Sequence, residues 1–536
     1  MKLNYKRTLF VGFAFFLICM FWQAYDTIIP LILTNKFGLS QTWSGVIMAL
    51  DNILALFLLP IFGSLSDKCK SKWGKRTPFI TVGTVLAAVL FILLSVTDAK
   101  QLTKLENVTP DKYESSLSVI YDADPMISVP KTEEDGKSFA EAVKKIFSAD
   151  EKQALSSVMT KDEFLGIKMY ETDENGEATT TVTEGYTNYV VPARNAYAWL
   201  MTVESPVTMI FFIVLLLLVL ISMGVFRSPA VALMPDVTIK PLRSKANAII
   251  NLMGAFGGII VLVLGMIFKT GSADNALMSY TVFFTIVSVI MLVSLAVFLV
   301  TVREPQWCRD MEEESRKLGI DESEGEEEKG KGGKLSKGEL RSLIFILASV
   351  ALWYMGYNAV SSKYSVYAGA VLNMDYNATL IIAQAAAIVS YIPVGIISSK
   401  FGRKKTIIAG VIILAASFFC CSLLRAGDSP LVMNILFSLA GIGWATINVN
   451  SYPMVVELAK NGNVGKYTGY YYTASMAAQV ITPILSGVFL DIRFTTLFPY
   501  ATIFVGLAFV TMLFVKHGDS NPEPKKSALE HLDVDM

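Results

Sequence analysis

The chain has 536 residues, of which 53% are hydrophobic and only 17% are charged, and its formal net charge is zero. Soluble domains carry about 25% charged residues, so this composition argues against a wholly soluble protein. The zero net charge gives no indication of a nucleic-acid partner. The only two histidines, His517 and His531, fall near the end of the chain. We therefore expect no enzyme, no cofactor and no metal site.

Apolar runs long enough to cross a membrane recur along the chain. A helix needs roughly 20 apolar residues to span a hydrocarbon core of about 30 Å. The first run contains Gln23 and Asp26 and has no small-residue cleavage site, so we interpret it as a retained span rather than a signal peptide. The fold class is predicted to be an all-α membrane protein with twelve transmembrane helices, at about 8–33, 41–64, 77–97, 203–234, 244–269, 276–301, 341–362, 378–398, 405–424, 430–456, 466–489 and 495–516.

The charges of the short loops predict the orientation. Loops rich in Lys and Arg remain in the cytoplasm, and such loops follow spans 2, 4 and 8. We expect a multi-pass protein of the plasma membrane with both termini cytoplasmic. The predicted division of the chain is 1–97 (helices 1–3), 98–200 (an extracytoplasmic insertion), 201–301 (helices 4–6), 302–340 (a cytoplasmic linker), 341–516 (helices 7–12) and 517–536 (a cytoplasmic tail).

The insertion, residues 98–200, is acidic and is expected to be partly folded. The stretch KSFAEAVKKIFS (137–148) has helical spacing, and FLGIKMYETDENGEATTTVTEGY (164–186) predicts two strands around Asn175 and Gly176. The insertion contains no cysteine, so we expect no disulfide framework there. A small solvated cap is the simpler interpretation, and a lid or a glycan-docking module is the alternative.

The basic loop GSLSDKCKSKWGKRTPFI (63–80) has a second copy, GIISSKFGRKK (395–405). Gly395 aligns with Gly63, and Ser399 stands where Asp67 stands in the first copy. A weaker match pairs ALMPD (232–236) with PMVVE (453–457). The first pair is separated by more residues than the second, and the excess is close to the length of the insertion. Transporters are often built from internal repeats, so we expect two six-helix halves, the first of them interrupted by the insertion.

Several segments resemble a known family. The basic loop is similar to the loop 2–3 signature of the major facilitator superfamily, split by the insert CKSKW. This loop and the segments RSPAVALMPDVTIKPLRSKANAIINLMGAFGG (227–258), MALDNILALFLLPIFG (48–63) and LWYMGYNAV (352–360) resemble bacterial members of the sucrose/proton symporter branch, in the glycoside–pentoside–hexuronide group. The resemblance covers nearly all twelve spans but not the insertion. It implies the major facilitator fold, with two pseudo-symmetric halves.

The resemblance also assigns the basic loop to a cytoplasmic gate. In that family the loop aspartate is thought to meet a helix N-terminus and basic partners across the interface between the halves when the inside is closed. Because Ser399 replaces this aspartate in the second copy, the latch is expected on one side only. The alternative is that the basic residues only set the topology. The gate residues implied here are Gly63, Asp67, Lys68, Gly74, Lys75, Arg76, Asp236, Gly402 and Arg403.

Polar residues within the spans form a pattern that is independent of the family resemblance. Spans 3, 6, 9 and 12 contain no charged or amide side chain well within the apolar run, whereas the other eight do. Polar groups are costly in hydrocarbon and usually face a cavity, so we expect these eight helices to line a path. The candidate substrate-binding residues are Trp22, Gln23, Asn52, Asn247, Asn251, Tyr354, Asn358, Gln384, Trp444, Asn448 and Gln479.

Amides and aromatic rings dominate this candidate set. Amides provide paired donors and acceptors, and rings offer flat apolar area to the C–H faces of a sugar. The set therefore predicts a neutral sugar, a di- or oligosaccharide, because an anion would need more cations within the spans. Any single Tyr or Trp, taken alone, is better explained by helix packing or by anchoring at the membrane interface.

Asp26, Asp51 and Arg227 are the ionisable residues within the spans. A carboxylate removed from water is costly in its charged form, so either aspartate is a candidate proton carrier, and Arg227 can pair with the ionised form and release the protonated one. The alternative is a fixed structural ion pair. Plant sucrose symporters have an aspartate where this chain has Leu220, and sodium-coupled melibiose-type relatives have a second aspartate where it has Ala55. We therefore expect coupling at Asp26 or Asp51, and to protons rather than sodium.

The expected function is the uptake of a neutral sugar by proton symport, by a monomer in the lipid bilayer. An uncoupled facilitator, a sodium-coupled symporter and a drug exporter are alternatives within transport. A non-transporting sensor, or an enzyme housed in the insertion, is the alternative from another class. The insertion has no His, no Cys and no phosphate-binding loop, so nothing in the sequence supports catalysis there.

Overall fold

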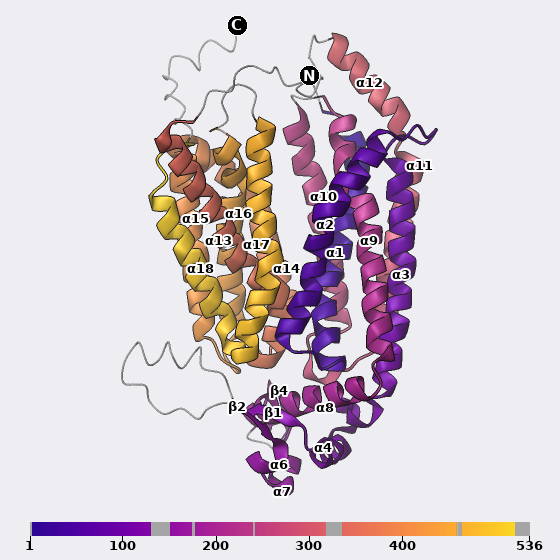
Figure 1. Cartoon of the computed structure of the whole chain (residues 1–536), viewed down its shortest axis with the longest axis vertical. Coiled ribbons are helices and arrows are strands. Elements are labelled where there is room, and N and C mark those ends of the chain that lie inside the picture. The colour runs from indigo at the N-terminus through magenta and orange to yellow at the C-terminus, as the bar shows by residue number, and fades with distance from the viewer. Residues whose placement is uncertain are drawn as a thin grey trace.

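The computed structural model describes residues 3–129, 151–173, 177–239, 242–317, 335–456, 458 and 464–519. In this part of the chain, eleven helices are long and apolar enough to cross a membrane. A twelfth helix, α14 (Tyr376–Phe401), is apolar over Tyr376–Tyr391. The helices form two bundles (Figure 1), and the predicted all-α membrane fold is confirmed.

Each bundle is one half of the chain with an apolar core of its own. The helix α12 (Glu304–Lys317) follows the first half, at the end of the molecule where the N-terminus lies. The first half contains α1 (Tyr5–Leu31), α2 (Gln41–Asp67), α3 (Thr77–Thr103), α9 (Val207–Asp236), α10 (Arg243–Ile267) and α11 (Thr281–Thr301). The second half contains α13 (Lys337–Tyr367), α14, α15 (Arg403–Leu423), α16 (Pro430–Val456), α17 (Val464–Ile492) and α18 (Leu497–Leu513).

The internal repeat is visible in the backbone. The first helix of each half, α1 or α13, continues into a π-helical turn, at Ile32–Lys36 and at Ala368–Leu372. The loop before the third helix of each half contains a glycine with positive φ, 115° at Gly74 and 90° at Gly402. Glycine adopts this conformation without steric cost. The halves therefore repeat their turns as well as their sequence.

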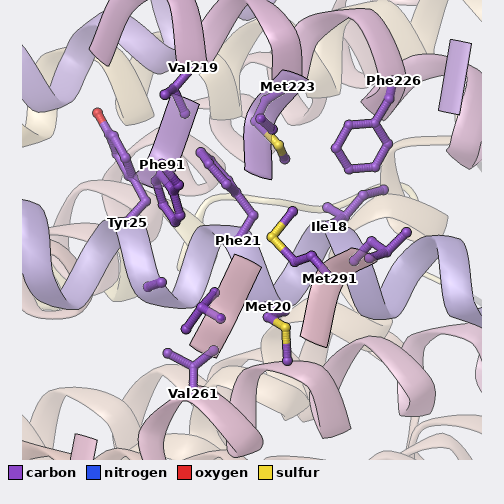
Figure 2. Packing of buried hydrophobic residues seen from close by; sticks show 14 of the residues in the cluster. Ile18, Met20, Phe21, Tyr25, Phe91, Val219, Met223, Phe226, Val261 and Met291 are labelled. Atoms are coloured by element: carbon purple, nitrogen blue, oxygen red, sulfur yellow. The ribbon is translucent and has the colours of Figure 1, made fainter. Parts of the chain in front are cut away.

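Apolar packing fixes the orientation of α1. Figure 2 shows Phe21 of α1 directed toward Phe91 of α3 and Val219 of α9. The rings of Phe21 and Phe91 stack with their centroids 4.8 Å apart. Phe21 is fully buried, whereas the neighbouring Trp22 and Gln23 keep partial exposure. Burial of one face in the first half thus leaves the polar face of α1 toward the second half.

The helices predicted to pack on the lipid side lie at the flanks of the molecule. Figure 1 shows α3 and α11 at one edge and α15 and α18 at the other. Within each half, α3 packs on α9 and α11, and α15 packs on α16 and α18. This is the arrangement expected from their lack of charged and amide side chains within the apolar runs.

In the part of the chain that the structure describes, the two halves meet most closely at one end. We call the end that carries residues 98–200 the insertion end, and the opposite end, where the N-terminus and α12 lie, the terminal end. Figure 1 shows the bundles converging toward the insertion end. There a Cβ on Gly45 of α2 would lie only 1.9 Å from the carbonyl oxygen of Pro483 of α17. Toward the terminal end the two bundles diverge in the same view, and Leu65 of α2 and Tyr472 of α17 are 49% and 54% exposed there.

The insertion folds around a small apolar core of its own. Its strands pair antiparallel, β1 with β2 and β3 with β4. The second pair confirms the predicted hairpin, although residues 174–176 at its tip lie outside the described residues, as does the predicted helix over 137–148. The elements are α4 (Tyr113–Asp122), β1 (Met126–Val129), β2 (Glu151–Ala154), α6 (Leu155–Val158), α7 (Lys161–Leu165), β3 (Tyr170–Thr172), β4 (Ala178–Val182) and α8 (Val191–Glu204).

The third helix runs to Thr103, beyond its predicted end at residue 97. The reason is a buried ion pair. Both carboxylate oxygens of Asp98 accept hydrogen bonds from Lys36 Nζ, at 2.6 and 2.7 Å, and both side chains are fully buried. The Lys36 ammonium also lies 4.5 Å from the centre of the Tyr280 ring. Asp98 therefore lies within the helix, whereas the prediction from the sequence made it the first residue of the insertion.

We expect Asp98→Asn to destabilise the fold by about 3–5 kcal/mol, because it leaves the Lys36 ammonium buried without a negative partner. Thermal unfolding in detergent, followed by tryptophan fluorescence, measures this change. The matched control is Lys161→Gln, which breaks an ion pair with Asp122 between exposed side chains and should leave the unfolding midpoint nearly unchanged. Equally small effects of the two substitutions would contradict a stabilising role for the buried Lys36–Asp98 ion pair.

Candidate functional site

Polar residues from both halves meet where the halves face each other. A Cβ on Gly258 of α10 would lie 3.4 Å from Oε1 of Gln23 on α1 and 3.3 Å from Nε2 of Gln384 on α14. Gln23 belongs to the first half and Gln384 to the second. The absence of a side chain at Gly258 thus brings two candidate binding residues, one from each half, to the same point.

The candidate binding residues keep access to solvent in the interior of the bundle. Asn251 is exposed, and the side chain of Asn247 lies outside those that the structure describes. Amide groups are costly to bury without partners, so partial exposure at this depth is consistent with a polar path between the halves. The half-buried members of the set are Trp22, Gln23, Asn52, Tyr354, Asn358, Gln384, Trp444, Asn448 and Gln479.

The three ionisable residues predicted within the spans, Asp26, Asp51 and Arg227, form a group in the first half. Their charges act on one another, from Asp26 on α1, Asp51 on α2 and Arg227 on α9. Asp51 accepts a hydrogen bond from Asn52 Nδ2 at 2.7 Å. The Arg227 guanidinium lies 5.2 Å from the centre of the Trp22 ring, within the range of a cation–π contact. Among the described side chains, no direct ion pair joins Arg227 to either aspartate, so this conformation does not show a fixed structural ion pair.

An aromatic group lies in the second half. Tyr357 of α13 stacks on Trp444 of α16, with ring centroids 3.7 Å apart and planes 3° from parallel. Tyr354 meets the same Trp444 ring edge-on at 5.1 Å. Tyr357 is absent from the predicted set. Its position one helical turn after Tyr354 could have identified it, because residues at that spacing share a face of the helix. Two tyrosines of α13 thus pack against the Trp444 ring, which itself remains half-buried.

Three polar atoms of this region have no hydrogen-bond partner among the described residues. They are Nε1 of Trp22, Nδ2 of Asn358 and Oε1 of Gln384. A buried unpaired donor or acceptor costs about 1–3 kcal/mol, so each such group in a native protein requires an explanation. Two donors and one acceptor, supplied by both halves, are the set that a ligand rich in hydroxyl groups would complete.

The basic loop between α2 and α3 is held within its own half. Arg76 pairs with Asp67 at 2.5 Å and with Asp236 at 2.8 Å, and it also donates to the hydroxyl of Ser66. Asp67 is 61% exposed, and Lys68 and Lys75 are exposed as well. In this conformation the loop aspartate therefore makes its ion pair within the first half and not across the interface.

Glu304, at the start of α12, completes this loop and is missing from the predicted gate. Its carboxylate accepts the backbone N–H groups of Lys75, Arg76 and Thr77, at 2.6, 2.9 and 2.8 Å. A carboxylate is favourable at a helix N-terminus, here that of α3. Gly74 permits the approach, because a Cβ there would lie 2.2 Å from Glu304 Oε2.

The second half has a matching carboxylate. Asp519, after α18, accepts the backbone N–H of Lys404 at 3.1 Å. A Cβ on Gly402 would lie 3.0 Å from the same carboxylate, and Arg403 is the first residue of α15. Each half thus places a carboxylate that follows its last spanning helix against the start of its third. The sequence repeat could not reveal this contact, because Glu304 lies 228 residues after Arg76.

Comparison with known protein families gives two matches. The sequence profile described as Major Facilitator Superfamily matches residues 195–444 and 378–533. The profile described as MFS/sugar transport protein matches residues 10–103. Together these matches include segments of both halves.

Curated relatives match over short segments. The Sucrose transport protein SUC4 of Arabidopsis thaliana is 34% identical over 60 residues, which are 11% of this chain and 12% of that protein. The Lactose permease of Lactobacillus helveticus is 42% identical over 48 residues, 9% of this chain and 8% of that protein. The match thus spans only a small part of the length of either relative.

Solved structures match over nearly the whole chain. The inward open conformation of the xylose transporter XylE from E. coli has a TM-score of 0.54 at 16% identity and covers 98% of both chains. The crystal structure of a D-xylose-proton symporter has a TM-score of 0.55 at 15% identity and covers 96% of this chain and 99% of that one. At these identities the likeness establishes the fold alone.

Proposed function

The chain belongs to the major facilitator superfamily, and we propose that it takes up a neutral sugar by proton symport through alternating access. The observation that carries the proposal is the composition of the interface between the halves. Amide and indole atoms from both halves, without a hydrogen-bond partner among the described residues, lie there with the stacked Tyr357 and Trp444 rings. Sugars offer hydroxyl groups to such atoms and C–H faces to such rings.

The names of the relatives support a sugar as the substrate. The proteins that share segments with this chain are a sucrose transport protein and a lactose permease. The solved structures of similar fold include xylose transporters. Sucrose and lactose are disaccharides, which favours a di- or oligosaccharide here. A drug exporter is less well supported, because such proteins favour a more apolar cavity.

The arrangement of the halves supports one state of an alternating-access cycle. The loops rich in Lys and Arg lie at the terminal end, so by the positive-inside rule we assign this end to the cytoplasm and the insertion end to the outside of the plasma membrane. The halves are joined at the insertion end and diverge toward the terminal end, as expected of a site open to the cytoplasm. Closing the terminal end would bring Asp67 toward the second half, where it could act as the gate.

The contact between Arg227 and Trp22 supports a link between the proton and the sugar. Arg227 lies over the Trp22 ring while it also acts electrostatically on Asp26 and Asp51. An ionised aspartate would draw the guanidinium toward itself, whereas a protonated one would leave it over the ring. Trp22 is a candidate sugar-binding residue, so the protonation state would change the site that the sugar meets. Such differential contacts are what coupling requires.

We expect an inward proton gradient to drive the accumulation of labelled sucrose in proteoliposomes. One of the two variants Asp51→Asn and Asp26→Asn should lose this accumulation, because one of these carboxyl groups carries the proton. The same variant should still exchange sucrose in the absence of a gradient. The matched control is Asp111→Asn, an exposed aspartate of the insertion, which should behave like the wild type.

Three results of this experiment would contradict the proposal. Uptake that ignores the proton gradient would make the protein an uncoupled facilitator. Accumulation driven by sodium in place of protons would make it a sodium symporter. Failure to transport or exchange any member of a panel of neutral mono-, di- and oligosaccharides would reject sugar transport.

We expect Trp444→Ala to weaken sucrose binding about tenfold, because the loss of an aromatic contact of about 1.4 kcal/mol changes the affinity by that factor. The concentration dependence of sucrose exchange measures the affinity. Trp43→Ala is the matched control, since Trp43 is 62% exposed at the insertion end of α2, and its affinity should be unchanged. A folded Trp444→Ala variant with the affinity of the wild type would remove this residue from the site.

A further inference from the structure

Two charged side chains of the second half hold the first turn of α2, which belongs to the first half. Asp491, at the end of α17, accepts the backbone N–H groups of Gln41 and Thr42 at 2.6 and 2.8 Å. Lys363 of α13 is fully buried, and its Nζ donates to the carbonyl oxygen of Gln41 at 3.0 Å. We call these three hydrogen bonds the α2 clamp.

The clamp satisfies groups that α2 cannot satisfy by itself. The first N–H groups of a helix have no partner within the helix. The side chain of Ser40, the residue just before α2, accepts the N–H of Trp43 at 3.3 Å. The carboxylate of Asp491 accepts the N–H groups of Gln41 and Thr42, the two residues that precede Trp43. Hydrogen bonds to a charged group are stronger than neutral ones, and negative charge is favourable at a helix N-terminus. The clamp therefore joins the halves strongly over a few atoms.

The repeat provides an internal comparison for the clamp. The contact of α10 with α14 is related to that of α2 with α17 by the repeat, and it also lies at the insertion end. There the bonds between the halves are neutral, because Thr270 Oγ1 meets the Tyr376 hydroxyl at 2.7 Å and Asn377 Nδ2 at 3.0 Å. The start of α14 is capped by Asp375 of its own half. The charged contact between the halves is thus a property of the α2 side and not a requirement of the fold.

We propose that Asp491 and Lys363 control the opening of the insertion end, and so set how readily the site becomes accessible from that side. The inference rests on the proposed alternating access, but not on the identity of the sugar or the coupling ion. Opening requires α2 and α17 to part, which breaks all three bonds of the clamp. Asp491 and Lys363 belong to the same half and already act on each other electrostatically. Once the clamp is released, both side chains remain in the second half, and the first turn of α2 loses all three of its bonds to that half.

The test measures accessibility and not transport. Ser44 of α2 is fully buried and lies one turn after the clamped residues, so Ser44→Cys is introduced into a chain whose five cysteines are replaced by Ser. A membrane-impermeant maleimide is added to the insertion-end side of reconstituted vesicles, and the rate of alkylation is followed. Asp491→Asn and Lys363→Met should each raise this rate about tenfold, as the loss of hydrogen bonds to a charged group predicts.

The matched control is Tyr376→Phe, which removes the neutral hydroxyl contact with Thr270 and leaves the clamp intact. It should raise the alkylation rate less than either clamp variant. Equal rates in the folded Asp491→Asn variant and its parent would overturn the proposal. If Asp491→Asn does not fold, Asp491→Glu moves the carboxylate by one methylene and must also raise the rate, and an unchanged rate there overturns the proposal as well. Loss of sugar transport in the parent chain, with the clamp effect retained, would reject the proposed function alone.

Discussion

The cost of placing a polar group in hydrocarbon organises this molecule. Charged and amide side chains occur within eight of the twelve spans, and a group of this kind requires either a partner or water. Just beyond the apolar runs of α1 and α3, Lys36 and Asp98 satisfy the same requirement by pairing with each other in a fully buried position. The candidate binding residues keep access to solvent, since none with a described side chain is fully buried. The same constraint explains why α3, α11, α15 and α18, which have no such residues in their apolar runs, lie at the flanks.

The helix α2 connects both ends of this arrangement. Its first turn is held by the second half through the α2 clamp, and its last residue, Asp67, pairs with Arg76 in the first half. In the proposed cycle these two ends alternate. When the insertion end is closed, the clamp is formed and Asp67 remains in its own half. When the insertion end opens, the clamp is broken and Asp67 becomes free to meet the second half.

Much of the fold could be predicted from the sequence, because hydropathy and periodicity are local properties. The spans, the peripheral helices and the hairpin in the insertion follow from runs, spacing and turn residues of this kind. The repeat was visible because both copies kept the basic loop, and the positive φ of Gly74 and Gly402 shows that the shared glycine has a shared physical role.

The contacts that the sequence did not reveal all join residues distant in the chain. Asp98 was assigned to the insertion and not to the third span, since its partner Lys36 lies 62 residues away in the sequence. Glu304 and Asp491 each accept hydrogen bonds from backbone N–H groups. Every residue except proline has such a group, so the sequence does not indicate which one is bound. Lys363 donates to the backbone carbonyl of Gln41, so the sequence contains no acidic side chain that would indicate its partner. Tyr357 is different. Its spacing from Tyr354 is visible in the sequence, and only its stacking on Trp444 required the structure.

The most direct test of the account measures both ends of the molecule at once by electron spin resonance distances. One pair of spin labels is placed at Glu114 and Ser429, exposed at the insertion end of each half, and another at Lys72 and Lys337, exposed at the terminal end. Addition of sucrose and a change of pH in lipid nanodiscs should shift the two distances in opposite senses, since one end closes as the other opens. Distances that shift in the same sense, or that remain fixed under every condition, would contradict alternating access between these halves.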